Sequence, residues 1–180
     1  MTRIRRLRDG AFTVTLLDDE FIALTELEAD LLGALADRLS AVADGAVDTS
    51  PLFPDAYPHD REANAEFHAL TDVDLVSAKS DAARSVMNAF AGADPKSSGT
   101  PWRQSDLRTV VFDSDAAHVF MRNLTDLRLL LAERLGIEND GDEGHQDAEH
   151  AVDLARYWWL GETQERLVAA LSASFGAGSR

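Results

Sequence analysis

Residues 145–150 read HQDAEH, a dense group of side chains that could bind a metal or exchange protons. Two histidines with a nearby glutamate suit a zinc hydrolase, in which they serve as ligands and general base. In the zinc-protease pattern H-x-x-E-H the glutamate follows the first histidine by three positions, whereas Glu149 follows His145 by four. Those two side chains could share one helix face, but two ligands do not make a site. We interpret the segment as a solvated acidic loop that leads into a helix, and keep a metal-assisted hydrolase using His145, Glu149 and His150 as an alternative.

Other short motifs with known chemistry do not match. The segment NDGDEG lacks the alternating acidic register and the distant glutamate of a calcium loop. GADPKSSGT contains glycine, lysine and serine without the phosphate-loop spacing, and neither a nucleophile elbow nor a dinucleotide fingerprint occurs. The sequence therefore predicts no catalytic residue and no cofactor.

Several polar residues lie where an apolar residue is expected. Lys79 falls inside an apolar helical stripe, Asn123 borders another with Asp126 further round, and Glu162 shares a face with Trp158. A buried charge must be paired or it costs several kcal/mol, so some of these side chains should meet across helices. We expect Lys79 to pair with Asp126 or with Glu162. The alternative is that each apolar stem lies along the core edge while its polar end reaches water.

Two aromatic positions are candidates for a partner-binding surface. Trp158 and Trp159 diverge by about 100° on a helix, so they cannot face one side. We expect both in the core, with one of them as a partner anchor being the alternative. In PLFPDAYPH (51–59), the prolines forbid continuous helix, and we expect Leu52, Phe53 and Tyr57 to be mostly buried. Joint exposure of Phe53 and Tyr57 would instead mark a partner site.

Composition excludes several classes of function. The chain has 180 residues, 45% of them hydrophobic, which suits one domain (1–180) with its own core. It has no cysteine, which fits a reducing cytoplasm, and no apolar run of about 18 residues or recognisable signal peptide, so neither a membrane span nor export is expected. The net charge of −15 disfavours nucleic-acid binding. The exception is the basic stretch RIRRLR, which we interpret as a solvated edge strand, with a nucleic-acid contact as the alternative.

Hydrophobic periodicity and turn signals predict a mainly α, single-domain helical bundle with a small antiparallel β-sheet. The Asp9-Gly10 pair predicts a tight hairpin turn, and the TELE box predicts a helix start at Thr25, with an earlier start near Asp19 as the alternative. Mobile loops are expected at about 92–104 and 138–147. The predicted strands are 3–7, 11–17, 20–24 and 107–112, and the predicted helices are 26–43, 60–69, 72–91, 114–135 and 147–175.

Two further features concern the helices. In the last helix, the apolar face before Gly161 (Ala151, Val152, Ala155, Trp158, Trp159) is nearly opposite the face after it, so the helix either bends there or meets different partners in its two halves; we favour the second. The segments FIALTELEADLL and TVVFDSDAAHVF share a plan of β run, cap and amphipathic helix. This weak symmetry suggests two β-helix-helix halves whose strands join one sheet.

Taken in order, the motifs RDG, LTELEADLL, LFPDAY, the Lys79 helix, NLTDLRLLLAERLGI and YWWLGETQERLVAAL resemble an uncharacterised actinobacterial family, the domain of unknown function numbered twenty-seventeen. The resemblance covers nearly the whole chain, which departs from it in a longer β segment between Gly10 and Thr25. Genes of that family commonly lie beside the gene for the adaptor that delivers N-end-rule substrates to the Clp protease. The resemblance thus implies, by association, a regulatory or adaptor-like role in protein turnover, and it implies no catalytic residues.

The sequence as a whole therefore predicts a cytoplasmic, non-enzymatic interaction or regulatory module with a protein partner, the Clp protease system being the one the resemblance implies. Self-association into a homo-oligomer also fits. The alternatives are a transcriptional regulator that uses the basic hairpin and the metal-assisted hydrolase. The residues expected in a partner surface or a buried polar network are Lys79, Asn123, Asp126, Glu162, Trp158 and Tyr57.

Overall fold

The computed structural model describes residues 2–45, 49–96, 107–139 and 141–176. The fold is mainly α with a small antiparallel sheet, as the sequence predicts. Among the described residues, no helix is both long and apolar enough to cross a bilayer. The elements are β1 (Arg3–Arg6), β2 (Phe12–Leu17), α1 (Asp18–Ala43), α2 (Arg61–Ala91), β3 (Asp94–Lys96), β4 (Leu107–Phe112), α3 (Ser114–Leu135) and α4 (Ala151–Gly176).

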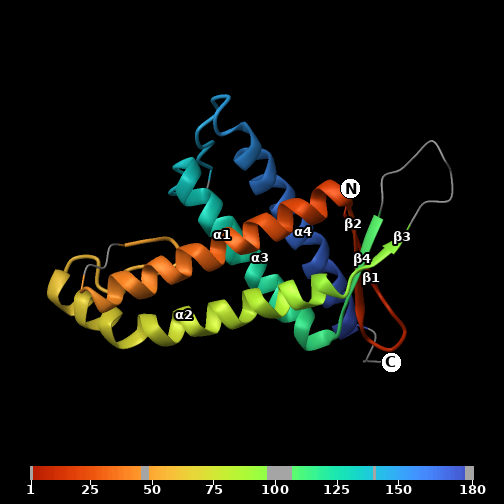
Figure 1. The fold of residues 1–180 in the computed structure, drawn as a ribbon, viewed down its shortest axis with the longest axis horizontal. Coiled ribbons are helices and arrows are strands. Elements are labelled where there is room, and N and C mark those ends of the chain that lie inside the picture. The colour runs from red at the N-terminus through yellow and green to blue at the C-terminus, as the bar shows by residue number, and fades with distance from the viewer. Residues whose placement is uncertain (1, 46–48, 97–106, 140, 177–180) are drawn as a thin grey trace.

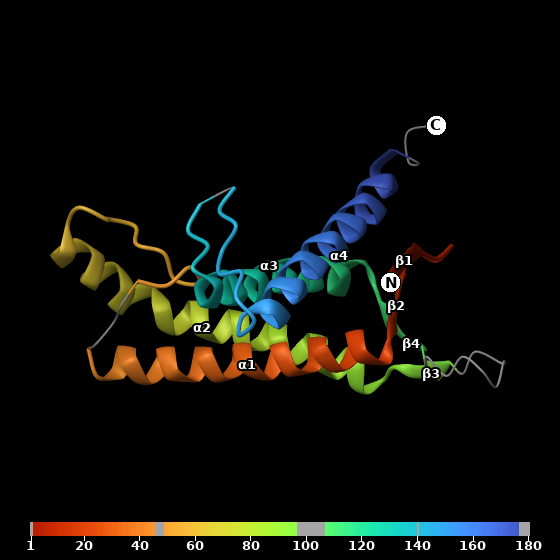
Figure 2. The same cartoon turned by 90° about the horizontal axis from the view of Figure 1, so that it is seen from above.

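The two longest helices set the shape of the molecule. Figure 1 shows α1 and α2 as an antiparallel pair, with the sheet at one end and the connection that precedes α2 at the other. α3 packs on this pair, and α4 packs mainly on α3 and on β1. Figure 2, seen from above, shows α4 crossing obliquely away from the α1–α2 pair.

The sheet has the strand order β1-β2-β4-β3, and all neighbours are antiparallel. The predicted hairpin is confirmed: Gly10 takes a φ of +90°, and its N–H donates to the carbonyl of Leu7. Alternate residues Phe12, Val14 and Leu16 are buried against the helices. The predicted strand 107–112 is confirmed as β4, beside β2. The outer neighbour of β4 is β3, which lies within the loop predicted at 92–104, so that prediction is wrong for residues 94–96. Residues 97–104 of the predicted loop lie outside the described residues.

The first helix begins earlier than the preferred prediction, and the predicted strand 20–24 is wrong. Leu17 is the N-cap of α1, and its N–H donates to Glu20 Oε2 at 2.9 Å. Three acidic residues in the first turn add favourable charge at this end of the helix. Thr25 therefore lies inside the helix and donates to the carbonyl of Phe21. The alternative start near Asp19 is the one that the structure confirms.

The two predicted helices 60–69 and 72–91 are one helix. α2 is continuous, and Thr71 is no cap, because its hydroxyl donates to the carbonyl of Phe67 at 2.8 Å. At the start of α2, the side chain of Asp60 accepts the N–H of Ala63. Continuity brings His68 and Asp72 onto one helix face, which the predicted break had concealed.

α3 agrees with its predicted bounds: Asp113 accepts the N–H of Ala116, and Gly136 ends the helix with a φ of +66°. The expectation that the two β-helix-helix halves share one sheet is also met, since β2 precedes α1, β4 precedes α3 and the two strands pair. The strand of the first half is β2, however, and not the FIAL run expected for it.

α4 starts at Ala151, after a turn at 148–150, and continues unbroken through Gly161. The predicted face before Gly161 is wrong, because Val152 and Trp158 are exposed. Leu154 and Tyr157 pack on the core instead, in line with the buried residues that follow them (Leu160, Thr163, Leu167 and Leu171). The helix therefore uses one face along its whole length.

The core joins the sheet to the helices through aromatic rings. Phe112 stacks on Phe120 with ring centroids 4.8 Å apart, and Phe120 meets Phe90 edge-on at 6.2 Å. At the other end of α1, Leu52 and Phe53 are buried as predicted, and the Arg38 guanidinium lies 4.7 Å from the Phe53 ring centroid. The proline-rich stretch is therefore a plug over the helices. Tyr57, expected to be buried, is 52% exposed.

We expect Gly161→Ala to stabilise the protein by about 0.5–1 kcal/mol, because glycine inside a helix is entropically costly. A Cβ at this position would lie 3.6 Å from Arg128 Cζ, an ordinary contact. Thermal unfolding measures the effect. The matched control is Gly136→Ala, which should destabilise, since the φ there is +66° and the Cβ would lie 3.0 Å from His145 Nε2. A lower unfolding midpoint for Gly161→Ala would contradict the packing described for α3 and α4.

Candidate functional site

The predicted pairing of Lys79 with Asp126 is present. Lys79 on α2 donates from Nζ to Asp126 Oδ1 on α3 at 2.5 Å, and both side chains are largely buried. Glu162, the other expected partner, is exposed and accepts instead from Arg166 at 3.2 Å. The sequence thus identified both members of the ion pair that joins α2 to α3.

Beside this pair lies a buried contact between α1 and α3. Asn123 Nδ2 donates to Glu28 Oε2 at 3.2 Å, and both residues are almost completely inaccessible to solvent. Glu28 Oε1 and Asn123 Oδ1 are buried without a hydrogen-bond partner. Burial raises the pKa of Glu28 to about 8, the Asn123 hydrogen bond lowers it, and the negative charge of Asp126 raises it further. Glu28 is therefore a neutral acid at pH 7.

Protonation of Glu28 would make the two unpartnered oxygens a donor and an acceptor. A proton on Oε1 turns that atom into a donor, and Asn123 Oδ1 is an acceptor on the same pair of side chains. The acid and the amide can then exchange two hydrogen bonds, as a carboxylic acid and an amide do. We refer to Glu28, Lys79, Asn123 and Asp126 as the central polar cluster.

A second polar group, the tip cluster, joins the far ends of α1 and α2 to the proline-rich segment. It consists of Arg38, Asp55, His68 and Asp72. Arg38 Nε donates to Asp72 Oδ2 at 2.8 Å. The His68 ring places Nε2 3.1 Å from Asp55 Oδ1 and Nδ1 3.0 Å from Asp72 Oδ1. Asn64 Nδ2 donates to Asp55 at 2.6 Å, which holds this carboxylate over the helix.

His68 can form hydrogen bonds with the other members of the tip cluster in both of its protonation states. Protonated His68 donates to Asp55 through Nε2 and to Asp72 through Nδ1; in the neutral form, Nδ1 can accept from Arg38 Nη2, 3.2 Å away. Burial lowers the pKa of His68, but the hydrogen bonds to Asp72 and Asp55 outweigh this and raise it above 6.5. The His68 hydrogen bond is also the main cause that lowers the pKa of Asp55.

The two tryptophans of α4 have different environments. Trp159 is half-buried, and its Nε1 donates to Thr2 Oγ1 at 2.9 Å, which holds the N-terminal strand against α4. Trp158 is 59% exposed, so the expectation that both lie in the core is wrong for this residue. Its ring meets Tyr157 edge-on with centroids 5.6 Å apart. If one of the two tryptophans is a partner anchor, Trp158 is therefore the candidate.

Trp158 borders a groove on the outside of α3 and α4. Two adjoining hollows share Leu129, Ala132, Ile137 and Glu138. One of them extends over Tyr157 and Trp158, and the other over Thr49, Ser50, Pro51 and Pro54. We call this surface the α3–α4 groove; its further lining residues are Arg128, Glu133, Gly136, Asn139, Gly141, Asp142, Glu143, Gln146 and Leu154.

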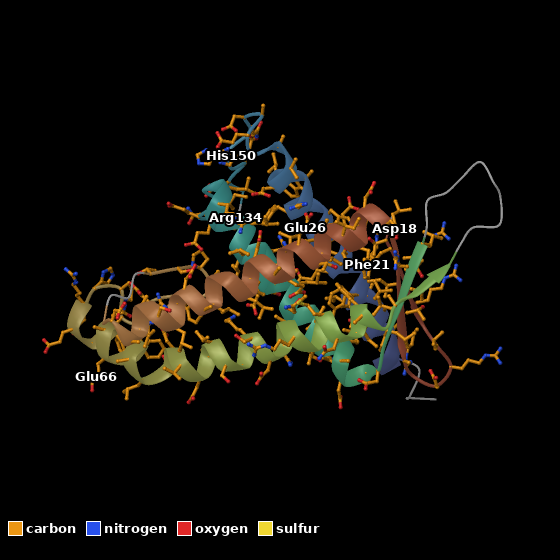
Figure 3. The ribbon with its side chains drawn as sticks, in the orientation of Figure 1. Asp18, Phe21, Glu26, Glu66, Arg134 and His150 are labelled. Carbon is orange, nitrogen blue, oxygen red and sulfur yellow. The ribbon has the colours of Figure 1, made fainter. Side chains whose placement is uncertain are left out.

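The helices that form the groove are fixed by cross-links. Arg128 on α3 donates to Gln164 Oε1 at 3.0 Å and to the Tyr157 hydroxyl at 3.3 Å, and its guanidinium lies 4.9 Å from the Tyr157 ring centroid. Arg156 on α4 donates to Glu26 on α1 at 2.6 Å. Figure 3 labels Glu26, together with Arg134, which donates to Asp30 at 3.0 Å. These contacts make the groove a preformed surface.

The expected metal ligands lie near the groove but do not converge. His145 and His150 have ring centroids 4.9 Å apart, while His150 Nδ1 lies 2.7 Å from Asp147 Oδ1. Figure 3 shows His150 at the loop end of α4. Over the described ranges, no group of three or more histidine, aspartate or glutamate side chains is placed to hold a metal ion.

Sequence reasoning missed Glu28 and most of the tip cluster. Glu28 follows Leu24 by four positions and precedes Leu31 by three, so its position in the inner stripe was a usable signal. Arg38 and Asp72 are 34 positions apart, and no local pattern connects them. Tyr57 and Trp158 border separate hollows and form no common site.

The chain is thus a mainly helical protein with two internal polar clusters and a preformed surface groove. The family model described as "Domain of unknown function (DUF2017)" matches residues 1–171, and the chain belongs to this family. No curated protein and no solved structure matches the chain. The family membership that the sequence motifs indicated is therefore confirmed.

Replacing Glu28 by glutamine should remove a pH dependence of stability. In the native protein, Glu28 retains its proton between pH 4.5 and about 8, whereas the unfolded chain has lost it. Its contribution therefore makes the free energy of unfolding fall, by about 1.4 kcal/mol per pH unit, as pH rises through this interval. Glutamine mimics the neutral acid, so Glu28→Gln should match the wild type near pH 4.5 and exceed it at pH 8.

Denaturant unfolding of both proteins across this pH range measures the difference. The matched control is Glu28→Leu, which also removes the titration but leaves Asn123 without its buried partner. It should be less stable than Glu28→Gln at every pH. Parallel curves for wild type and Glu28→Gln would show that Glu28 does not hold a proton in the native state.

The tip cluster gives a second pH-dependent prediction. The pKa of His68 is raised on folding, so the stability that its protonation provides is present below pH 6.5 and is lost as pH rises through the folded pKa. Asp55→Asn should lower the pKa of His68, because it removes a carboxylate that accepts a hydrogen bond from the protonated ring. Titration of the imidazole ring protons by NMR measures this shift. Asp74→Asn, an exposed position of α2 outside the cluster, is the control and should leave the pKa unchanged. An unchanged value in Asp55→Asn would rule out this contact.

Proposed function

We propose that this chain is a non-enzymatic protein-interaction module of the cytoplasm and that the α3–α4 groove is its contact surface. The observation that carries the proposal is Trp158, 59% exposed on a helix at the border of a hollow with apolar and acidic lining residues. Tryptophan beside a pocket is the residue type that most often dominates the binding energy of an interface. Contact with a partner would remove the apolar surface of this side chain from water, which is favourable.

The placement of Trp158 also supports this function. It precedes Trp159 and follows Tyr157, and both of these neighbours are held by hydrogen bonds to other elements. A partner would therefore find the indole in a fixed position, and little conformational freedom would be lost on binding. This rigidity suits a recognition surface better than it suits an incidental exposed residue.

The finer part of the proposal is that the partners include components of the Clp protease system. Its support is the gene neighbourhood that accompanies the family resemblance. A module of this kind would act through recognition, as a regulator or an adaptor in protein turnover, and would need no catalytic residue of its own.

A transcriptional regulator is the second candidate. The observation that favours it is β1, an edge strand on which Arg3, Arg5 and Arg6 are exposed. With a net charge of −15 over the chain, this edge would have to bind nucleic acid alone. The metal-assisted hydrolase has no comparable support, because no three candidate ligands in the described part of the chain are placed to hold a metal ion.

Trp158→Ala should reduce recovery of the native partner at least tenfold in a pull-down of the tagged full chain from its own host. Val168→Ala, which shortens another exposed apolar residue of α4 away from the groove, is the matched control and should recover the partner like the wild type. Mass spectrometry should identify Clp components in the wild-type and control samples.

Equal recovery with Trp158→Ala, or recovery of chaperones alone, would count against the groove as the contact surface. Recovery of nucleic acid that depends on Arg5 and Arg6 would favour the regulator. Circular dichroism of each variant establishes that its helices are intact, so that a loss of binding cannot be assigned to unfolding.

A further inference from the structure

The charges along the α3–α4 groove define what it can bind. Four carboxylates line the two hollows: Glu133, Glu138, Asp142 and Glu143. The one cation among the described lining residues is Arg128, whose guanidinium already bonds Gln164 and Tyr157 and lies over the Tyr157 ring. The groove therefore has an excess of negative charge that its own side chains do not neutralise.

The loop that carries part of this charge is held in place. Asp142 Oδ2 accepts the N–H groups of Glu138 at 3.0 Å and Asn139 at 2.7 Å. Those backbone hydrogen bonds, led by the one from Asn139, hold the pKa of Asp142 below its usual value. The N–H of His145 donates to the carbonyl of Leu135, which ties the far side of the loop to the end of α3. The Asp142 carboxylate thus has a fixed position relative to the groove.

The floor between these charges is apolar. Leu129, Ala132 and Ile137 are shared by the two hollows, and Tyr157 and Trp158 extend the apolar surface at one end. A ligand that fits must therefore bring an apolar side chain to the floor and positive charges to the rim. A single metal ion or a small anion would leave the apolar floor uncovered.

Resting on the proposed function, we infer that the occupant of the α3–α4 groove is a peptide segment with an aromatic or aliphatic side chain flanked by lysine or arginine. The apolar side chain packs against Leu129, Ile137 and Trp158, and the flanking cations lie near Glu138 and Glu143. A second copy of this chain is a poor occupant, because two proteins of charge −15 repel each other and would bring like charges together at this rim.

Synthetic peptides test this chemistry directly on the full chain. The probe is fluorescein-labelled Gly-Ser-Lys-Lys-Phe-Lys-Lys-Ser-Gly, measured by fluorescence anisotropy. One comparison peptide has glutamate in place of each lysine, and the other has serine in place of phenylalanine. We expect the first probe to bind more tightly than either comparison peptide, with an affinity that falls as salt is added.

Variants of the chain locate the site. Trp158→Ala should weaken binding of the lysine–phenylalanine probe about tenfold. The double variant Glu138→Gln and Glu143→Gln should weaken it and flatten its salt dependence, whereas Glu165→Gln, an exposed glutamate of α4 outside the groove, should do neither. Glu138 and Glu143 are exposed, and the hydrogen bond that Glu143 Oε2 accepts from Gln146 Nε2 lies on the surface, so the double variant tests charge and not folding.

Equal binding of the lysine and glutamate peptides, or no binding of either, would overturn the inference. The proposed function would survive that result if the pull-down still depended on Trp158, since only the chemistry of the partner would then be wrong. Analytical ultracentrifugation of the full chain tests whether a second copy fills the groove. A dimer that dissociates in Trp158→Ala would also overturn the inference, because the groove would then be filled by a second copy.

Discussion

The ladder between β2 and β4 is the contact on which the arrangement of all four helices depends. The two strands pair antiparallel from Phe12 opposite Phe112 to Leu17 opposite Leu107. α1 starts directly after β2 and α3 directly after β4, so the two helices leave from opposite ends of the ladder. They then meet where Asn123 donates to Glu28. Once this crossing is set, α2 is fixed by Lys79 and Asp126, and α4 by Arg128.

Where α1 and α3 cross, the contact is made by the polar side chains of Glu28 and Asn123, although two apolar side chains could also fill this space. A hydrogen-bonded acid and amide add specificity, because sliding α3 by one helical turn would leave both groups buried without partners. The neighbouring Lys79–Asp126 pair makes the same demand on α2. The tip cluster does so at the far end of the α1–α2 pair, where Arg38 donates to Asp72. The register of α1 and α2 is therefore set near the middle of each helix and again at the tip.

Local signals were enough to predict elements whose ends are marked by their own residues. α3 is the clearest case, with Asp113 as its cap and Gly136 as its stop. The start of α1 was misplaced because two capping patterns compete, and Glu20 bonded to the Leu17 N–H prevails over the box at Thr25. The division of α2 failed for a similar reason: Thr71 satisfies its hydroxyl within the helix.

Contacts between distant residues were predictable only where a charged residue interrupted an apolar stripe. Lys79 met that condition, and its partner Asp126 followed from the need to neutralise it. Arg38 also continues an apolar stripe, three positions after Leu35, but its partners could not be predicted. His68 and Asp72 share one helix face only because α2 is continuous, and the predicted break concealed that continuity. Trp158 was misplaced because hydrophobicity alone does not show which of two adjacent tryptophans the neighbouring helix covers.

The separation of β2 from β4 also determines when the protein can fold during its synthesis. Thr15 and Thr109 face each other across the ladder but are 94 positions apart in the chain. Until the ribosome has released Leu107–Phe112, β2 has only β1 beside it, and the other edge of this apolar strand is unpaired. The α1–α2 hairpin, whose contacts lie closer in sequence, can form before that point. Closure of the sheet is therefore a late step, and the nascent chain presents an open strand edge for most of its translation.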